Sequence, residues 1–166
     1  IENAKLREQL GAPVPATYKI IPAKVISVSK FMEISGGSSD QIKTGMAVVD
    51  GSTYIGKVSK TQEFRSLVLL PYDPQSSIPV KTSRGTQGVV IGQAGGVILM
   101  DKILQKDPVF LDDLVVTSGE GDYPPNLIIG KIIHVNTDDV SPYKQAKIMP
   151  AVDYNTEDYV YVLTSI

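Results

Sequence analysis

The chain has 166 residues, of which 42% are hydrophobic and 20% are charged, and it contains no cysteine. This composition supports a packed core and argues against disorder, while the lack of cysteine excludes disulfides, thiolate metal sites and cysteine nucleophiles. The net charge of −2 argues against a nucleic-acid-binding protein, because no basic stripe is available to neutralise phosphates. No apolar run reaches the roughly 20 residues that a membrane-spanning helix needs.

The N-terminal segment, residues 1–11, is rich in helix formers, and Leu6 and Leu10 lie one turn apart on the same face. A glycine and a proline follow, in the order typical of a helix C-terminus. No N-cap residue precedes the segment, so we expect it to be the end of a longer, coiled-coil-type helix; a short docking helix fits the same pattern. Residues 12–22 are predicted to form an extended linker because they contain three prolines: Pro13, Pro15 and Pro22.

One pattern occurs twice in the chain, over residues 48–58 and 115–132. Each copy has a strand of β-branched residues, a turn with glycine, and a second strand that reads Ile-Gly-Lys-Val or Ile-Gly-Lys-Ile. β-Branched residues favour a pleated sheet, and glycine adopts the positive φ of tight turns at little cost. Similar strands flank both copies: residues 23–26 and 88–91 before them, and the proline-ended runs 67–71 and 146–150 after them. The repetition predicts two related β domains in tandem.

The rest of the chain also reads as short strands between turn-rich stretches, which is typical of an all-β protein. Further strands are expected at residues 78–81, 97–100 and 159–163, with an irregular connection at residues 101–113. Small closed barrels are favoured because closure removes exposed strand edges. Proline, aspartate and serine cluster over residues 72–77, so we place the first barrel at residues 23–75 and the second at residues 76–166.

Tandem β-barrels raise the hypothesis of a chymotrypsin-like hydrolase with a Ser-His-Asp triad. The single histidine, His134, lies in an alternating strand, where a position on the polar face explains it. Ser118 lies in the turn of the second copy, at the place that Asp50 and Gly51 occupy in the first copy. The turn therefore explains Ser118 without catalysis. We assign no catalytic residue, and the hydrolase remains an alternative.

No metal or cofactor site is predicted either. Asp112-Asp113 and Asp138-Asp139 are adjacent pairs, and neighbouring strand residues point to opposite faces, so neither pair makes a ligand set by itself. Residues 36–40 resemble a phosphate-binding loop in composition only, since the Gly-Lys-Ser/Thr ending is missing. We interpret that stretch as a turn into Ile42.

Three tyrosines gather near the C-terminus: Tyr154, Tyr159 and Tyr161. Tyr159 and Tyr161 share one strand face. Core or edge packing is the first interpretation, and contact with a partner through amphipathic tyrosines is the second.

Taken in order, these motifs resemble the extracytoplasmic part of the rod shape-determining MreC family over nearly the whole chain. Residues 2–10 approximate a helix end of the form Glu-Asn-x-x-Leu-Arg-x-x-Leu. The other matching motifs are Ala-Lys-Val-Ile at 23–26, Lys-Thr-Gly-Met-Ala-Val-Val at 43–49, Ile-Gly-Lys-Val at 55–58, Val-Val-Thr-Ser-Gly at 115–119 and Pro-Asn-Leu-Ile-Ile-Gly-Lys-Ile at 125–132.

The resemblance implies two six-stranded β-barrels that follow the end of a coiled-coil dimerising helix. It also implies a single-pass protein at the extracytoplasmic face of the bacterial cell membrane, with a transmembrane helix upstream of this chain. The implied function is a non-catalytic scaffold of the cell-elongation machinery that needs no cofactor, organises peptidoglycan synthases and determines cell shape. The implied partners are MreB, MreD, a RodA-type glycosyltransferase, a class B penicillin-binding protein and, through the upstream helix, a second copy.

Two positions depart from the pattern of the family. Asp112 stands where the family often has glycine, and Pro125-Asn126-Leu127 stands where the family usually has Pro-x-Gly. Among the residues other than glycine, asparagine tolerates the left-handed conformation best, so we expect the turn to survive.

The scaffold would bind its partners by strand pairing or apolar docking. Two other hypotheses for the function stay open: the two-barrel hydrolase and a ligand-binding β module of an export assembly.

Overall fold

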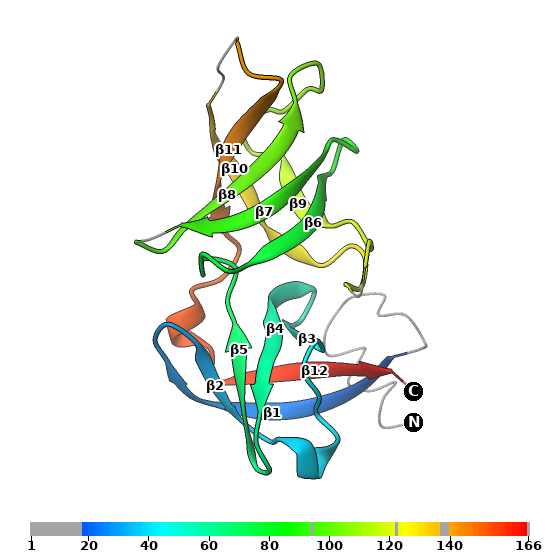
Figure 1. The fold of residues 1–166 in the computed structure, drawn as a ribbon, viewed down its shortest axis with the longest axis vertical. Coiled ribbons are helices and arrows are strands. Elements are labelled where there is room, and N and C mark those ends of the chain that lie inside the picture. Colours follow the sequence, from blue (N-terminus) through cyan, green and yellow to red (C-terminus); the bar gives the residue numbers. More distant parts are fainter. Residues whose placement is uncertain (1–17, 94, 122, 137–139, 166) are drawn as a thin grey trace. The chain divides into compact units, whose positions relative to one another are not determined.

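The computed structural model describes residues 18–93, 95–121, 123–136 and 140–165. These residues form β-strands with two short 3-10 turns, and they divide into two compact units (Figure 1). The first unit comprises residues up to Leu70 together with residues from Asp153 onwards, and the second comprises Pro71–Val152. Within the described ranges, no helix is long and apolar enough to cross a membrane. The expected helix over residues 1–11 and the first part of the linker lie outside the described residues.

The first unit is a closed barrel of six strands. They are β1 (Tyr18–Val28), β2 (Met32–Ser35), β3 (Ala47–Asp50), β4 (Thr53–Thr61), β5 (Arg65–Leu69) and β12 (Tyr159–Ser165). Antiparallel pairs run in the order β12, β1, β2, β5, β4 and β3, and β3 pairs again with β12, which closes the ring. The 3-10 turn η1 (Ser38–Asp40) lies between β2 and β3, and η2 (Tyr154–Thr156) precedes β12.

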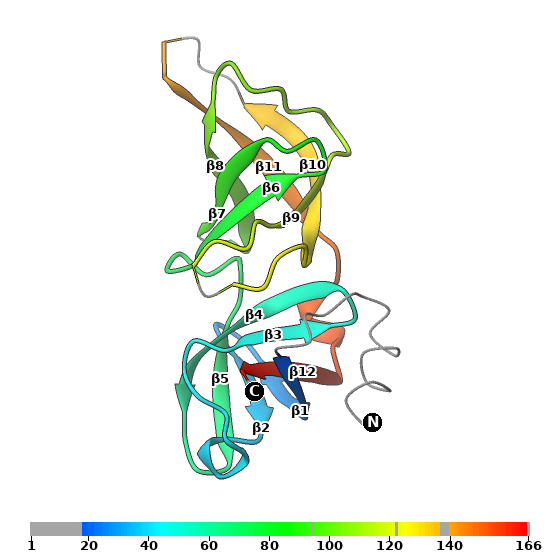
Figure 2. The same cartoon turned by 90° about the vertical axis from the view of Figure 1, so that its right-hand side faces the viewer.

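The second unit is also a closed barrel of six strands. They are β6 (Ser77–Thr82), β7 (Gln87–Gln93), β8 (Val97–Leu104), β9 (Leu114–Thr117), β10 (Ile128–Asn136) and β11 (Tyr143–Pro150). The antiparallel order is β6, β7, β8, β11, β10 and β9, and β9 returns to β6 (Figure 2). The prediction of an all-β fold with two six-stranded barrels is therefore confirmed. One detail differs, because β8 continues to Leu104, past its predicted end at Met100.

Side chains from alternating strand positions fill both barrels, as expected where one face of each strand points inward. The buried positions of the first barrel include Met32, Ile34, Val48, Ile55, Val68 and Val162. Those of the second barrel include Ile78, Val90, Met100, Ile129, Ile132 and Ile148. Each unit therefore has its own apolar core.

The two rings have the same strand order when β12 is matched with β6. Strands β1 to β5 then correspond to β7, β8, β9, β10 and β11. Strand β6 follows β5 in the chain but closes the second barrel, whereas β12 follows β11 but closes the first. Each repeat thus supplies five strands to one barrel and its sixth strand to the other.

The two connections that cross between the units each contain the same type of turn. The Oδ1 atom of Asp73 accepts a hydrogen bond from the N–H of Gln75 at 2.8 Å, and that of Asp153 accepts one from Asn155 at 3.0 Å. The carbonyl groups of the same aspartates accept the N–H groups of Ser76 and Thr156, at 2.9 and 3.1 Å. An aspartate that caps a turn two residues on therefore lies in each connection.

The predicted domain boundaries differ from the structure. The chain leaves the first unit after Leu70 rather than after residue 75, and residues from Asp153 onwards belong to the first barrel, not the second. The reason is pairing at long range, because β12 pairs with β1 along its length and with β3. Its buried residues Val160 and Val162 complete the first core.

The predicted linker over residues 12–22 is also wrong from Tyr18 onwards, where β1 begins. Pro22 pairs with Tyr161 of β12, whereas β2 pairs with β1 only from Val25. Proline is tolerated in a strand where one side has no partner for a backbone N–H. Pro22 therefore did not exclude a strand.

The Ile-Gly-Lys motif has the same structural role in both barrels. A Cβ atom on Gly56 of β4 would collide with the carbonyl of Leu69, and one on Gly130 of β10 would collide with the carbonyl of Met149. Just beyond each motif the pairing shifts register, between Val58 and Lys60 and between Ile132 and His134. The glycine admits the neighbouring backbone, and the bulge then bends the strand around the barrel.

Candidate functional site

The structure separates the two residues of the hydrolase hypothesis. Ser118 follows β9, where the N–H of Thr117 donates to the carbonyl of Leu127. The exposed His134 lies seven residues beyond Leu127 along β10, which is roughly 20 Å in an extended strand. The hydroxyl of Ser118 accepts the N–H of Glu120 at 3.5 Å, within the turn. The geometry does not bring this histidine to this serine.

The adjacent aspartates of the second barrel face different partners. The exposed carboxylate of Asp112 lies 3.7 Å from Nζ of Lys131, whereas the buried carboxylate of Asp113 lies 2.9 Å from Nε of Arg84. Across the described ranges, no three His, Asp or Glu side chains gather where a metal ion could bind. The other predicted pair, Asp138-Asp139, lies outside the described residues.

Residues 36–40 form a turn, as the sequence interpretation expected. Asp40 accepts the N–H of Gly37 at 3.2 Å, and the chain continues into the fully buried Ile42. A Cβ atom on Gly37 would collide with the carbonyl of Gln62. Close backbone packing therefore explains this glycine.

The three C-terminal tyrosines divide between core and surface. Tyr154 is buried in η2, whereas Tyr159 is exposed at the start of β12. Tyr161 is half-buried on the same strand. The packing interpretation thus holds for Tyr154, and Tyr159 remains available for contact.

A carboxyl pair that sequence reasoning missed lies in the first barrel. Burial raises the pKa of Glu157 to about 8, and a side-chain hydrogen bond with Asp50 and the charges of Asp50 and Asp158 act in the same direction. Asp50 ends β3 and Glu157 precedes β12, so the pairing of β3 with β12 brings the two together. Because the pKa of Glu157 is raised in the folded protein, its titration makes stability depend on pH.

An apolar surface lies on the second barrel. It consists of Phe110 (50% exposed), Leu111 (61%), Leu114 (39%) and Met149 (51%), and is called the apolar surface below. Lys131 of β10 pairs in register with Leu114 on one side and Met149 on the other. A groove of about 250 Å³ lies here, lined by Leu114, Gly130, Lys131, Met149, Pro150 and Ala151. Grouped exposed apolar side chains of this kind mark protein-binding sites.

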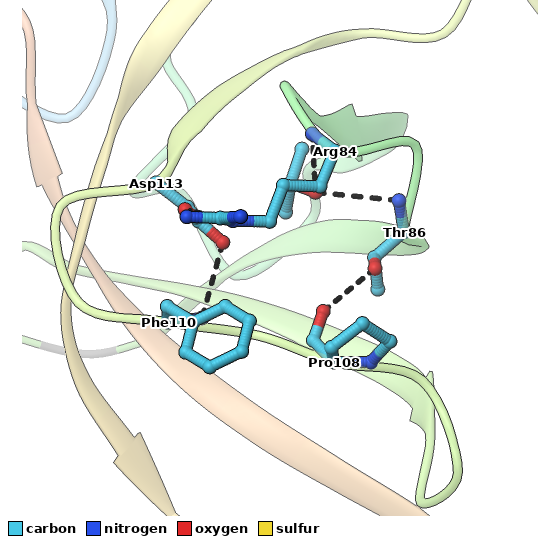
Figure 3. Close-up of polar contacts among 6 residues, drawn as sticks. Arg84, Thr86, Pro108, Phe110 and Asp113 are labelled. Carbon is cyan, nitrogen blue, oxygen red and sulfur yellow. Dashed lines mark hydrogen bonds and ion pairs between the residues drawn. The ribbon is translucent and has the colours of Figure 1, made fainter.

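The loop that carries Phe110 and Leu111 is held in place from both ends (Figure 3). The buried carboxylate of Asp113 accepts Nε–H of Arg84 at 2.9 Å and the N–H of Phe110 at 3.0 Å. The hydroxyl of Thr86 donates to the carbonyl of Pro108 at 2.7 Å. The guanidinium of Arg84 also lies 4.7 Å from the centre of the Phe110 ring, within cation–π range. The loop is therefore ordered before any partner arrives.

Sequence reasoning did not identify this surface. Arg84 and Asp113 are far apart in the sequence and meet because β6 pairs with β9. The one available signal was the run Phe110-Leu111, two large apolar residues in a stretch that was predicted to be an irregular connection.

Comparisons with known proteins identify the family. The family model described as rod shape-determining protein MreC, barrel core, matches residues 20–164. The cell shape-determining protein MreC of Listeria monocytogenes is 31% identical over 98% of this chain and 59% of its own length. That of Escherichia coli K12 is 27% identical over 98% of this chain and 46% of its own length. That of Cereibacter sphaeroides is 29% identical over 78% of this chain and 42% of its own length. The chain thus spans about half the length of the curated relatives it matches.

Solved structures show the same fold. A structure of MreC from Listeria monocytogenes has a TM-score of 0.82 at 29% identity, and the match covers 99% of this chain and 84% of that one. MreC from Pseudomonas aeruginosa has a TM-score of 0.79 at 24% identity, covering 88% and 99% of the two chains. The strand order, the repeated motifs and the match of the family model agree. The chain belongs to the MreC family of rod shape-determining proteins.

Proposed function

We propose that this chain is the extracytoplasmic part of a non-catalytic scaffold that helps determine cell shape by organising peptidoglycan synthases. Membership of the family supports the role in cell shape. The partner class is suggested by a structural neighbour, the complex between penicillin-binding protein PBP2 and MreC from Helicobacter pylori, matched at a TM-score of 0.73 and 15% identity. The synthase bound by this chain would accordingly be a class B penicillin-binding transpeptidase.

The observation that carries the proposal is an ordered apolar surface on a closed barrel. Both rings close on themselves, so the described strands offer no free edge for strand pairing. Binding must then use side chains, and the exposed residues Phe110, Leu111 and Met149 supply them. The separation of Ser118 from His134 favours this role over the hydrolase.

The remaining parts of the scaffold would lie outside the described residues. A transmembrane helix upstream would anchor the protein, and the helix that ends near Leu10 would hold two copies together. MreB, MreD and a RodA-type glycosyltransferase would be further partners of the whole protein. These assignments follow from the family resemblance and extend the proposal to the complete assembly.

The test is direct binding between this chain and the extracytoplasmic part of the class B transpeptidase of the same organism. Surface plasmon resonance or biolayer interferometry should give saturable binding that an unrelated periplasmic β-barrel protein does not compete for. Binding absent at concentrations where the scaffold and transpeptidase of a known pair still bind would contradict the proposal. A parallel assay with peptide and glycan substrates should show no turnover.

A further inference from the structure

We propose that the chain consists of two halves that bind each other by donating β-strands, and that either half can be replaced by the same half of a second copy of the chain. The first half comprises the residues up to Arg84, and the second comprises those from Gly85 onwards. The halves meet in the sequence at the exposed turn between β6 and β7. The inference goes beyond the scaffold function, because it concerns how the molecule itself is assembled.

Each half contains a barrel that lacks one strand. In the first half, β1, β2, β5, β4 and β3 are neighbours in this order, which leaves β1 and β3 as edges. In the second half, β7, β8, β11, β10 and β9 leave β7 and β9 as edges. Edge strands have unpaired backbone groups and take up a further strand by pairing with it. Each half alone would therefore have a gap that binds one strand.

Each half also carries the strand that fills the gap of the other. Strand β12 of the second half pairs with β1 and β3, and β6 of the first half pairs with β7 and β9. The donated strands complete the two cores, because Val160 and Val162 of β12 and Ile78 and Val80 of β6 are at most 1% exposed. The register of the pairing and the inward side chains thus select the occupant of each gap.

The first barrel shows that a donated strand needs no hairpin to stay in place. Strand β12 pairs with β1 from Tyr18 to Lys24, although all the other strands lie between these two in the sequence. Strands β6 and β7 have the equivalent places in the second barrel, and there a short turn joins them. Because the first ring closes without such a turn, the bond between Arg84 and Gly85 is not needed to close the second.

Further contacts would hold the end of β6 after this bond is cut. The N–H of Ser83 donates to the carbonyl of Leu114 at 2.9 Å. Nε of Arg84 lies 2.9 Å from the buried carboxylate of Asp113. A cut after Arg84 leaves both donors on the first half and both acceptors on the second. The contacts would then join the two halves to each other.

Strand donation belongs to the repeat and not to one barrel. A turn capped by aspartate precedes each donated strand, at Asp73 before β6 and at Asp153 before β12. Both halves therefore have five strands of one barrel, a capped turn and a donated strand, in the same order. The exchange of an identical element between copies is a low-cost route to association. The same half of a second copy is accordingly a fitting partner.

The experiment cuts the folded full chain. The recognition sequence of a specific protease is inserted between Arg84 and Gly85, and the chain is folded, purified and then cleaved. The two products should elute together at about 1 µM, as the partners of a stable protein interface do. Strands β6 and β12 should keep their protection from hydrogen exchange.

The matched control moves the cut to the connection between the barrels. Pro74 and Gln75 are both exposed, so the same recognition sequence can be inserted between them. After this cut β6 stays on the fragment that contains β7 and β9, and β12 is the one donated strand between the products. Their dissociation constant should be at least about tenfold higher than that of the products cut after Arg84.

Replacement by a second copy is measured with isotope-labelled protein. Labelled and unlabelled chains, both cleaved after Arg84, are mixed, unfolded in urea and refolded together. Native mass spectrometry should show hybrid molecules, with one labelled and one unlabelled half, as abundant as the parental pairs.

Separation of the products cut after Arg84 at about 1 µM would overturn the inference, since the peptide bond would then hold the halves together. Equal affinity after the two cuts would also overturn it, because β6 would contribute nothing as a donor. Refolding without hybrids would exclude replacement by a second copy. If the insertion prevents folding of the uncleaved chain, the two halves are expressed together as separate chains, and their purification as one complex decides. None of these outcomes bears on the scaffold function.

Discussion

At the scale of single residues, backbone conformation explains the two departures from the family pattern. Asp112 has φ 70° and Asn126 has φ 65°, so both lie in the left-handed region. For Asn126 this confirms the expectation that asparagine can keep the turn. Gly45, the counterpart of Asp112 in the first barrel, has φ 92°. The two versions of the turn need the same backbone shape, and one meets it without glycine.

Replacing Asp112 by glycine should therefore stabilise the protein. The left-handed conformation costs an L-residue about 1–2 kcal/mol, and less for aspartate, so we expect a gain of about 0.5–1 kcal/mol. The ion pair with Lys131 that is lost contributes little, because its partners are mostly exposed. Urea unfolding would measure the gain. The reciprocal change, Gly45→Asp, should lower stability; a gain in both variants would contradict this account.

The Asp50–Glu157 pair predicts how stability depends on pH. The pKa of Glu157 is raised to about 8 in the folded protein from its ordinary value of 4.5. Between these two pH values the folded protein holds a proton that the unfolded chain has released. The unfolding free energy contributed by this proton is present below about pH 4.5 and declines as the pH rises towards 8. Glu157→Gln keeps a hydrogen-bond donor beside Asp50 without the titration. Urea midpoints between pH 5 and 8.5 should decline less in this variant, and parallel profiles would refute the assignment.

At the scale of elements, the repeated hairpin is the part of the fold that the sequence predicts best. β-Branched runs and turn glycines indicate both hairpins, and the order of flanking strands indicates that two domains repeat. The close approach of backbone at Gly56 and Gly130 could not be predicted, because it depends on the neighbouring strands β5 and β11. The Arg84–Asp113 pair was missed for the same reason, since it requires a known strand register.

The glycine of the Ile-Gly-Lys motif should be sensitive to a single added methyl group. Gly130→Ala forces the Cβ atom against the carbonyl of Met149, so a backbone shift is required. Overpacking of this kind costs about 1–3 kcal/mol, and we expect the upper part of this range, with a similar loss for Gly56→Ala. The control is Gly85→Ala, where the added Cβ meets nothing within 4 Å and only the positive φ opposes it. Equal losses of stability at Gly85 and Gly130 would show that crowding is not the cause.

At the scale of the whole molecule, the exchange of sixth strands decides which residues make up each barrel. Sequence similarity ends with the proline-ended strand of each copy, so nothing in the pattern indicated where residues 159–165 pair. A strand is naturally assigned to the domain that precedes it in the chain. Here the register of β12 with β1 and β3 assigns it instead to the first barrel.

Truncation after Asp158 tests this assignment. Removal of β12 opens the first ring and exposes buried neighbours such as Ile20 and Val48, so β1 and β3 should lose protection from hydrogen exchange. The second barrel keeps all six strands and should retain its protection. Mass spectrometry of exchanged peptides distinguishes the two. Loss of protection confined to β6–β11 would instead support the boundaries first predicted from sequence.

The two crossings have a mechanical consequence. The chain enters the second barrel after Leu70 and returns at Asp153, so two segments of the chain connect the barrels. Force applied to the second barrel therefore reaches the first through both segments, and a proteolytic cut in one segment would leave the barrels covalently joined by the other.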